Sequence, residues 1–208
     1  MILLSSLAAL RGKLRAFFPR YRWAAACFAL FFLLQLAFQL STGAFRSELG
    51  GHPDEASHFV TGLMVREFMR VGNLGSPMEF AEDYYVHYPK VAFGHWPPFF
   101  YVVQTAWSFV FGASRDSILV LITFLSATLA LSVSWLVKKE TGLLMGVLSG
   151  FLVIAIPLLQ KMAGLVMAEV LLALLMFWTV VFFGFFLEKG RTKYAVGFST
   201  VVTLAVMT

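Results

Sequence analysis

The sequence predicts an all-α fold: a polytopic bundle of transmembrane helices with one long polar loop after the first helix. Composition gives the first indication, because 60% of the 208 residues are hydrophobic and only 13% are charged. A soluble domain is about half apolar and about a quarter charged. Arrangement gives the second, because the apolar residues form long runs and basic residues cluster beside them. We therefore expect the membrane, and no nucleic acid, as a partner.

The first transmembrane helix is expected at 23–40, after a basic cytoplasmic segment over 1–22. The run 23–40 has no charge, and its helical length of about 27 Å is close to the thickness of the hydrocarbon core. Basic residues before this run hold the N-terminus in the cytoplasm: Arg11, Lys13, Arg15, Arg20 and Arg22. A signal peptide cleaved near 41–44 is the alternative, which the long basic segment and the later apolar runs disfavour.

Three more spans and the start of a fifth helix are expected at 117–137, 142–160, 164–187 and 194–208. The apolar stretch 97–112 is short for a span, so charge must decide how it lies. If 97–112 lies in the interface, the later basic residues lie on the cytoplasmic side together with the N-terminus, as the positive-inside rule favours. These residues are Lys138, Lys139 and the basic residues after 187. The segment 41–116 is then an extracytoplasmic loop of an inner-membrane or plasma-membrane protein.

The loop 41–116 is expected to hold two interfacial helices, near 54–71 and 97–112. Apolar side chains of the first recur on one helical face: Phe59, Val60, Leu63, Met64 and Phe68. Such an amphipathic helix suits the plane of the interface. The stretch 72–96 is expected to be ordered loop, because it is rich in Gly, Pro, Tyr and acids. The pair Pro97-Pro98 then begins the second helix, where proline fits the first turn.

Two short motifs in this loop carry the candidate chemistry: Gly-His-Pro-Asp-Glu-Ala at 51–56 and Gly-His-Trp-Pro-Pro at 94–98. Asp54 and Glu55 stand at the start of the first interfacial helix, where acids are often only caps. The helix N-terminus also favours an ionised carboxylate there. Asp54 is therefore a candidate proton acceptor in catalysis, with Glu55 beside it.

His52 and His95 are candidate ligands or proton carriers of the two motifs. With Asp54 they would form a site for a divalent metal, although their spacing matches no metal-binding signature. Tyr88 and Trp96 are candidates for stacking on a sugar. The alternative for such aromatic residues is a place in the aromatic belt at the membrane surface.

Two charged residues are further candidates for substrate binding. Lys90 is available to a donor phosphate, with a solvated surface charge as the alternative. Glu169 is an acid within an apolar run, and a charge at the bilayer centre costs roughly 2.5–3.5 kcal/mol. At the outer end of its span Glu169 would face the same aqueous pocket as Asp54. Alternatively it marks the membrane boundary or pairs with Lys161.

The order of these elements resembles the first extracytoplasmic loop of the C-type membrane glycosyltransferases. The segments that carry the resemblance are Pro-Asp-Glu-Ala at 53–56, the amphipathic helix, and Pro-Pro-Phe-Phe-Tyr at 97–101. The sequence is most similar to the dolichyl-phosphate-mannose–protein mannosyltransferase and aminoarabinose transferase family, over most of 23–187. The resemblance implies inverting transfer of a sugar from a polyprenyl-phosphate carrier to a lipid, glycan or protein acceptor. It also implies that Asp54 is the acid/base residue, with Glu55 beside it.

The chain departs from the family pattern near the double proline. His95 stands where many members have Glu, and Trp96 falls where the aminoarabinose transferases have a phosphate-binding Lys. Lys90 or an Arg beyond residue 208 is the candidate to replace that cation, and Glu169 matches the place of an acid near the fourth span. Members of the family have more spans, so we expect a fragment of a longer protein that continues after Thr208.

Two other classes of function remain as alternatives. A transporter or permease subunit would hold ionisable residues near the middle of the bilayer and broken helices in two corresponding halves. The charges of this chain instead cluster in one loop, and the runs between 117 and 187 hold few. A non-catalytic membrane scaffold is the second alternative, and its loop should tolerate the substitution Asp54→Asn.

Overall fold

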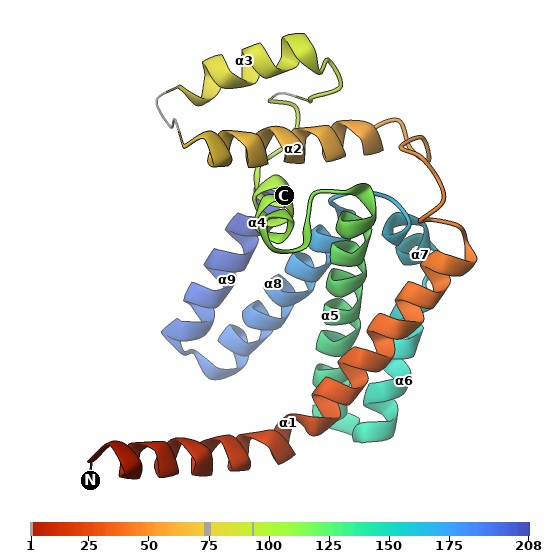
Figure 1. Ribbon diagram of the computed structural model, residues 1–208. Helices are drawn as coiled ribbons and strands as arrows, with labels where there is room; N and C mark the ends of the chain where they lie inside the picture. The colour runs from red at the N-terminus through yellow and green to blue at the C-terminus, as the bar shows by residue number, and fades with distance from the viewer. Residues whose placement is uncertain (1, 73–75, 93) are drawn as a thin grey trace.

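The computed structural model describes residues 2–72, 76–92 and 94–208, with side chains from residue 22 onward. Helices dominate the described chain and no strand occurs in it, which confirms the predicted all-α class (Figure 1). The helices are α1 (Ile2–Ser41), α2 (Glu55–Val71), α3 (Pro77–His87), α4 (Phe99–Phe111), α5 (Arg115–Thr141), α6 (Leu143–Ile154), α7 (Pro157–Ala163), α8 (Glu169–Lys189) and α9 (Thr192–Val206).

Among the described residues, three helical segments are long and apolar enough to cross a membrane: Arg22–Ser41 of α1, α5 and α8. Helices α6 and α7 meet the same criterion as a pair bent by 60°. The three segments overlap the spans expected at 23–40, 117–137 and 164–187. They are consistent with a membrane protein.

The stretch 142–160, expected as one span, is divided between α6 and α7, which together meet the length and hydropathy criterion of one bent span. Ile156 has extended backbone angles (φ −62°, ψ 120°), and Pro157 begins α7. Proline lacks an N–H and disfavours helical geometry in the residue before it, so the helix ends there. The next helix also begins later than expected, at Glu169 in place of 164.

Helix α3 lies within the stretch 72–96, so the expectation of loop there is wrong. Pro77 occupies the first turn of α3, where the missing N–H has no helical partner to lose. Phe80, Tyr84 and Tyr88 follow at intervals of four, and successive ring centroids lie 6.0 and 4.7 Å apart. Phe80 also lies 5.4 Å from Phe68 of α2, measured between ring centroids. These aromatic contacts along one face stabilise α3 against α2.

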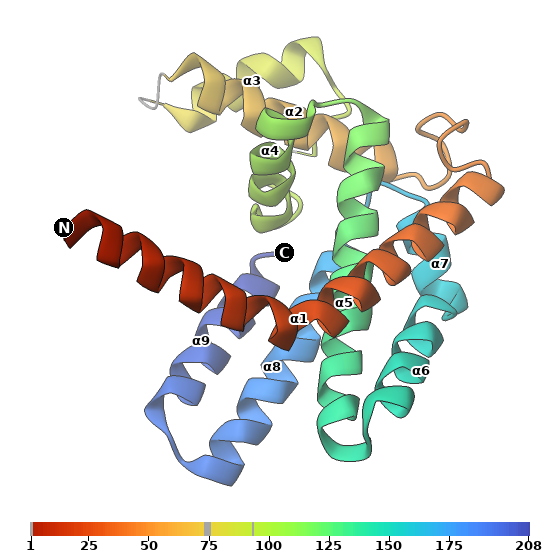
Figure 2. The same ribbon diagram turned by 60° about the horizontal axis from the view of Figure 1, so that its bottom comes forward.

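Helix α5 lies between α1 and α6 on one side and α8 and α9 on the other (Figure 1, Figure 2). The connections from α5 to α6 and from α8 to α9 lie together, at what we call the turn end. Helices α2, α3 and α4 lie at the opposite end, which we call the α2 end. There the N–H of Phe99 in α4 donates to the carbonyl of Met207 after α9, at 2.7 Å.

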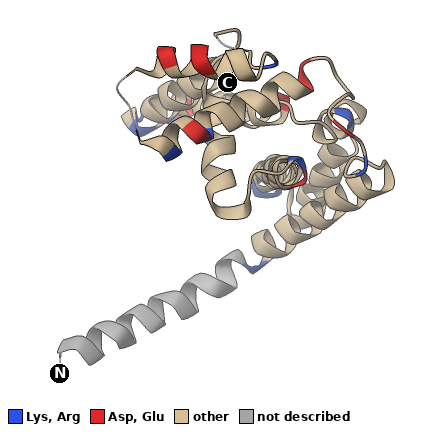
Figure 3. Ribbon diagram, turned by 45° about the horizontal axis from the view of Figure 1, so that its top comes forward, with Lys and Arg blue, Asp and Glu red and all other residues tan. Residues whose placement is uncertain are grey.

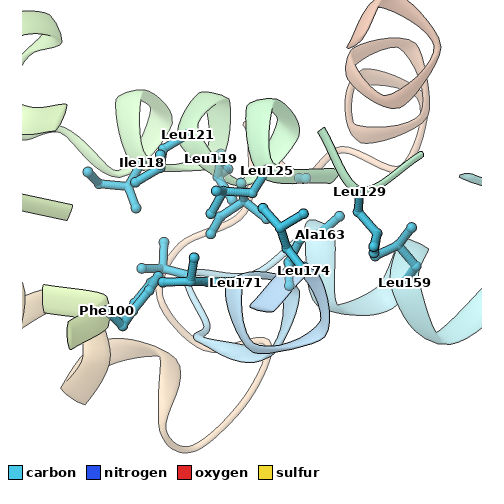
Figure 4. Packing of buried hydrophobic residues seen from close by; sticks show 14 of the residues in the cluster. Phe100, Ile118, Leu119, Leu121, Leu125, Leu129, Leu159, Ala163, Leu171 and Leu174 are labelled. Atoms are coloured by element: carbon cyan, nitrogen blue, oxygen red, sulfur yellow. The ribbon is translucent and has the colours of Figure 1, made fainter. Parts of the chain in front are cut away.

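An apolar core joins α5 to α4, α7 and α8 (Figure 4). Its labelled members are Phe100, Ile118, Leu119, Leu121, Leu125, Leu129, Leu159, Ala163, Leu171 and Leu174. Phe100 is fully buried in this core. The start of α4 is therefore fixed against the central helices, and the double proline before it is fixed as well.

Buried glutamines attach α1 to its neighbours. The Gln39 amide accepts a hydrogen bond from Thr123 Oγ1 at 2.5 Å and donates to the carbonyl of Ala163 at 2.6 Å. The amides of Gln35 and Gln160 donate to each other at 3.2 and 3.0 Å. Because polar groups in an apolar environment need partners, these bonds favour one arrangement of α1, α5 and α7.

Candidate functional site

The candidate site lies at the α2 end, where acidic residues gather on α2 and α3 (Figure 3). Helices α2 and α4 cross closely there, and Gln104 Nε2 donates to the carbonyl of Phe59 at 3.3 Å. A Cβ atom on Gly62 would overlap the Gln104 amide, so glycine permits the close approach. The packing of α2 on α4 brings the segments 51–56 and 94–98 to the same end of the molecule.

Asp54 is the residue before α2, and its carboxylate is accessible. Its side chain is 47% exposed and makes no hydrogen bond to the first turn of the helix. The nearest titratable side chain is His52, whose Nδ1 lies 3.6 Å from Asp54 Oδ2. The same Nδ1 accepts a hydrogen bond from the Asp54 backbone N–H at 3.3 Å. Asp54 therefore occupies a cap position while its carboxylate stays available to another molecule.

Glu55 lies in the opposite environment, because its side chain is fully buried. Its Oε1 accepts hydrogen bonds from Arg115 Nε and Nη2, at 3.1 and 2.8 Å. The backbone N–H of Val166, between α7 and α8, donates to the same oxygen at 3.2 Å. Oε2 is also buried and has no hydrogen-bond partner among the described residues. The geometry makes Glu55 an anchor of the site, beneath the accessible Asp54.

Arg115, at the start of α5, is the residue that sequence reasoning missed. Its Nη1 donates to the carbonyl of Ala44 at 2.6 Å, and its Nη2 lies 3.5 Å from the carbonyl of Gly164. One guanidinium thus joins the turn after α1, the first residue of α2 and the link before α8. Its neighbours in sequence give no sign of this, since a cation beside an apolar run usually marks only a membrane boundary.

His58 forms the buried side of the site. Its Nδ1 lies 2.9 Å from the hydroxyl of Tyr101, and its ring stacks on Trp96 with centroids 4.3 Å apart. Burial lowers the pKa of His58 below its ordinary value of 6.5; the charge of Asp54 opposes this shift and His52 adds to it. Burial also raises the pKa of Tyr101. Both side chains are therefore neutral at pH 7.

Trp96 links the second motif to the first. One face of its ring lies on His58, and its ring also meets His95 in a perpendicular arrangement with centroids 4.9 Å apart. A sugar stacking on Trp96 would therefore be limited to the other face. The His95 side chain is exposed, so it is accessible near the rim of the site.

Lys90 and Tyr88 lie on the segment after α3, and both are exposed. This segment returns to α2, because the backbone N–H of Ala92 donates to Thr61 Oγ1 at 3.1 Å. Tyr88 stacks on Tyr84 of α3, which occupies one side of its ring. Within the described residues Lys90 makes no ion pair. It is a free cation at the same end of the molecule as Asp54.

Glu169 does not join the group around Asp54. It is exposed at the start of α8 and lines an apolar hollow of about 240 Å³ between α5, α6, α7 and α8, and Asp54 is not part of that hollow. No ion pair between Glu169 and Lys161 forms in the described structure. Glu169 is the first residue of α8, so it stands at the end of a candidate membrane span.

The metal hypothesis receives no geometric support. His52 and Asp54 are neighbours, whereas His95 meets Trp96. In the part of the chain that the structure describes, no three His, Cys, Asp or Glu side chains are grouped so that they could hold a metal ion.

In comparisons with protein-family models, curated proteins and solved structures, no match to this chain was found.

Proposed function

We propose that this protein transfers a sugar from a polyprenyl-phosphate carrier to a hydroxyl-bearing acceptor at the α2 end. The observation that carries the proposal is the contrast between two adjacent acids. Asp54 is accessible and makes no bond to its helix, whereas Glu55 is buried and held by Arg115. One carboxylate is thus free to react while the other fixes its position, as acid/base chemistry at a rigid site requires.

The proposed reaction is a single displacement with Asp54 as the base. The Asp54 carboxylate takes the proton of the acceptor hydroxyl as its oxygen bonds to the anomeric carbon. The bond from that carbon to the phosphate oxygen breaks, and its electron pair leaves with the lipid phosphate. The anomeric configuration inverts, and one carboxylate suffices, unlike the paired carboxylates of retaining hydrolases. The departing phosphate is already acidic, so it needs a nearby cation such as Lys90 more than a proton.

The proposed membrane arrangement places this chemistry at the outer surface. Helices α1, α5, the α6–α7 pair and α8 would cross the bilayer, and α2 and α4 would lie in the interface. The structure supports this by grouping the basic residues of three segments at the turn end: Lys138 Nζ lies 3.5 Å from the Trp23 ring, and Lys139 and Lys189 both lie over the Phe185 ring. The positive-inside rule then puts the turn end in the cytoplasm.

The test is transfer of radiolabelled sugar from polyprenyl phosphate, using the protein expressed from its complete reading frame and reconstituted in vesicles. We expect Asp54→Asn to lower kcat about 100-fold or more, because a general base contributes roughly 10²–10⁴-fold. The melting temperature should stay within a few degrees, since Asp54 makes no bond to its helix. The matched control is Glu48→Gln, an exposed acid of the same loop, which should keep full activity.

Two outcomes would overturn the proposal. Equal transfer rates for the Asp54→Asn variant and the unchanged protein would remove the base from the mechanism. Absence of transfer from any polyprenyl-phosphate sugar by the unchanged, folded protein would reject the donor class. Uptake of a solute into the same vesicles by the unchanged protein would favour the transporter alternative.

A further inference from the structure

The turn end carries a concentration of positive charge that the proposed reaction does not use. Cations from three chain segments gather there: Arg22, Lys138, Lys139, Lys189, Arg191 and Lys193. Two acids accompany them. Glu140 lies 3.1 Å from Lys139, and Glu188 lies 3.9 Å from Lys189. The remaining cations make no ion pair among the described residues, and residues 1–21 contain no acid that could supply one.

An aromatic hollow lies beside this charge, between α1, α5 and α8. Its volume is about 240 Å³, and its lining is almost entirely apolar: Trp23, Ala24, Thr128, Leu131, Ser132, Trp135 and Trp178. The Trp178 indole N–H donates to Ser132 Oγ at 3.1 Å, and Thr128 Oγ1 donates to the carbonyl of Phe124 at 2.8 Å. The polar groups of Thr128, Ser132 and Trp178 are therefore hydrogen-bonded within the helices that line the hollow.

Aromatic contacts connect the cations of the turn end to the hollow. Lys138 Nζ lies 3.5 Å from the centroid of the Trp23 ring, and Trp23 lines the hollow. Trp135, on the same lining, meets Phe185 with centroids 6.5 Å apart. Lys189 Nζ lies 4.7 Å from the centroid of that Phe185 ring. Aromatic rings thus hold Lys138 of α5 at the rim of the hollow and Lys189 of α8 one ring further away.

From this arrangement we infer that the turn end binds one anionic phospholipid. Its phosphate lies among Lys138, Lys189 and Arg22, and one of its acyl chains occupies the hollow lined by Trp23 and Trp135. Basic pockets between helices at a membrane surface bind acidic head groups. A free phosphate would leave the apolar hollow unfilled, and the extra positive charge of a choline head group would be repelled by the surrounding cations. The inference is independent of the sugar-transfer proposal.

The test measures lipid binding to the purified protein in detergent by native mass spectrometry. Phosphatidylglycerol and phosphatidylcholine with the same acyl chains are titrated in parallel. We expect phosphatidylglycerol to bind at least tenfold more tightly. Each cation near an anionic lipid contributes about fivefold, so Lys138→Gln and Arg22→Gln should each weaken phosphatidylglycerol binding several-fold. Trp135→Ala should weaken the binding of both lipids, because it removes a wall of the hollow.

The matched control is Lys161→Gln, an exposed lysine on α7 away from the turn end, which should leave both affinities unchanged. Melting curves of each variant separate loss of binding from loss of fold, and exposed Arg22 gives a variant expected to stay folded. Equal affinity for the two lipids would overturn the inference. So would unchanged phosphatidylglycerol binding in both cation variants, or displacement of the lipid by inorganic phosphate at similar concentration.

Discussion

At the residue scale, the two adjacent acids show what a sequence motif can and cannot indicate. The motif drew attention to Asp54 and Glu55, but it did not distinguish their environments. That distinction depends on Arg115, which lies 60 positions away along the chain. Because local sequence carries no record of such a pairing, neither the burial of Glu55 nor its anchoring role could be predicted. The same holds for the contact between His58 and Tyr101.

The Glu55–Arg115 pair makes a testable prediction about stability. Arg115→Met leaves a buried carboxylate without its partner, which costs about 3–5 kcal/mol, so the melting temperature in detergent should fall clearly. Arg46→Met is the control, because Arg46 is an exposed loop residue and should change stability by less than about 0.5 kcal/mol. Adding Glu55→Gln to Arg115→Met should recover part of the loss, since the unpaired charge is gone. Equal melting temperatures for Arg115→Met and the unchanged protein would contradict the structural role.

His58 leads to a prediction about pH. Its pKa is lowered in the folded protein, chiefly by burial, so the unfolded chain binds the proton more readily. Stability is therefore fully present above the ordinary pKa of 6.5 and is lost as pH falls through the folded pKa. We expect the melting temperature to decrease between pH 7 and pH 5, and His58→Asn to reduce that decrease. In His87→Gln, which changes an exposed residue, the dependence should persist. If His58→Asn leaves the change of melting temperature with pH unaltered, other titratable groups control that change.

At the element scale, periodicity and backbone chemistry explain both the successes and the errors. The apolar face of 54–71 indicated helix α2 because its spacing repeats over several turns. Helix α3 was missed because proline and acids suggested loop, although Phe80, Tyr84 and Tyr88 have helical spacing. The break before Pro157 follows from the restriction that proline places on Ile156. The bend of 60° there depends on packing and could not be derived from the sequence.

The packing of α6 against α5 leads to a prediction about glycine. A Cβ atom on Gly146 would lie 2.7 Å from the Ser134 carbonyl oxygen and 2.6 Å from Lys138 Cβ. Small residues permit such close approach between membrane helices, so Gly146→Ala should separate the two helices and cost about 1–3 kcal/mol. Gly184→Ala on α8 is the matched control, because no atom lies within 4 Å of the added group. Equal unfolding midpoints in denaturant titrations of these two variants would refute the close packing.

At the scale of the whole molecule, composition predicted the helical class and the candidate spans, whereas side-chain pairing determines how they assemble. Gln35 and Gln160 are 125 residues apart in sequence, yet they join α1 to α7 through reciprocal bonds. No periodic pattern links them. Charge patterning predicts that the basic segments share one side of the membrane, and in the described residues Lys138, Lys139 and Lys189 lie at the turn end. Which side of a membrane that end faces stays a prediction.

The sidedness can be tested because the chain has a single cysteine, Cys27, which Cys27→Ala removes. New cysteines are then placed at exposed Lys139 on the turn end and at exposed Tyr85 on α3. A membrane-impermeant maleimide applied to intact cells should label the cysteine at 85 and spare the one at 139, because the positive-inside rule retains basic segments in the cytoplasm. Permeabilised cells provide the control, and both positions should label equally there. Labelling of position 139 in intact cells would reverse the orientation and place Asp54 on the cytoplasmic side. An extracytoplasmic sugar transfer would then have no accessible base.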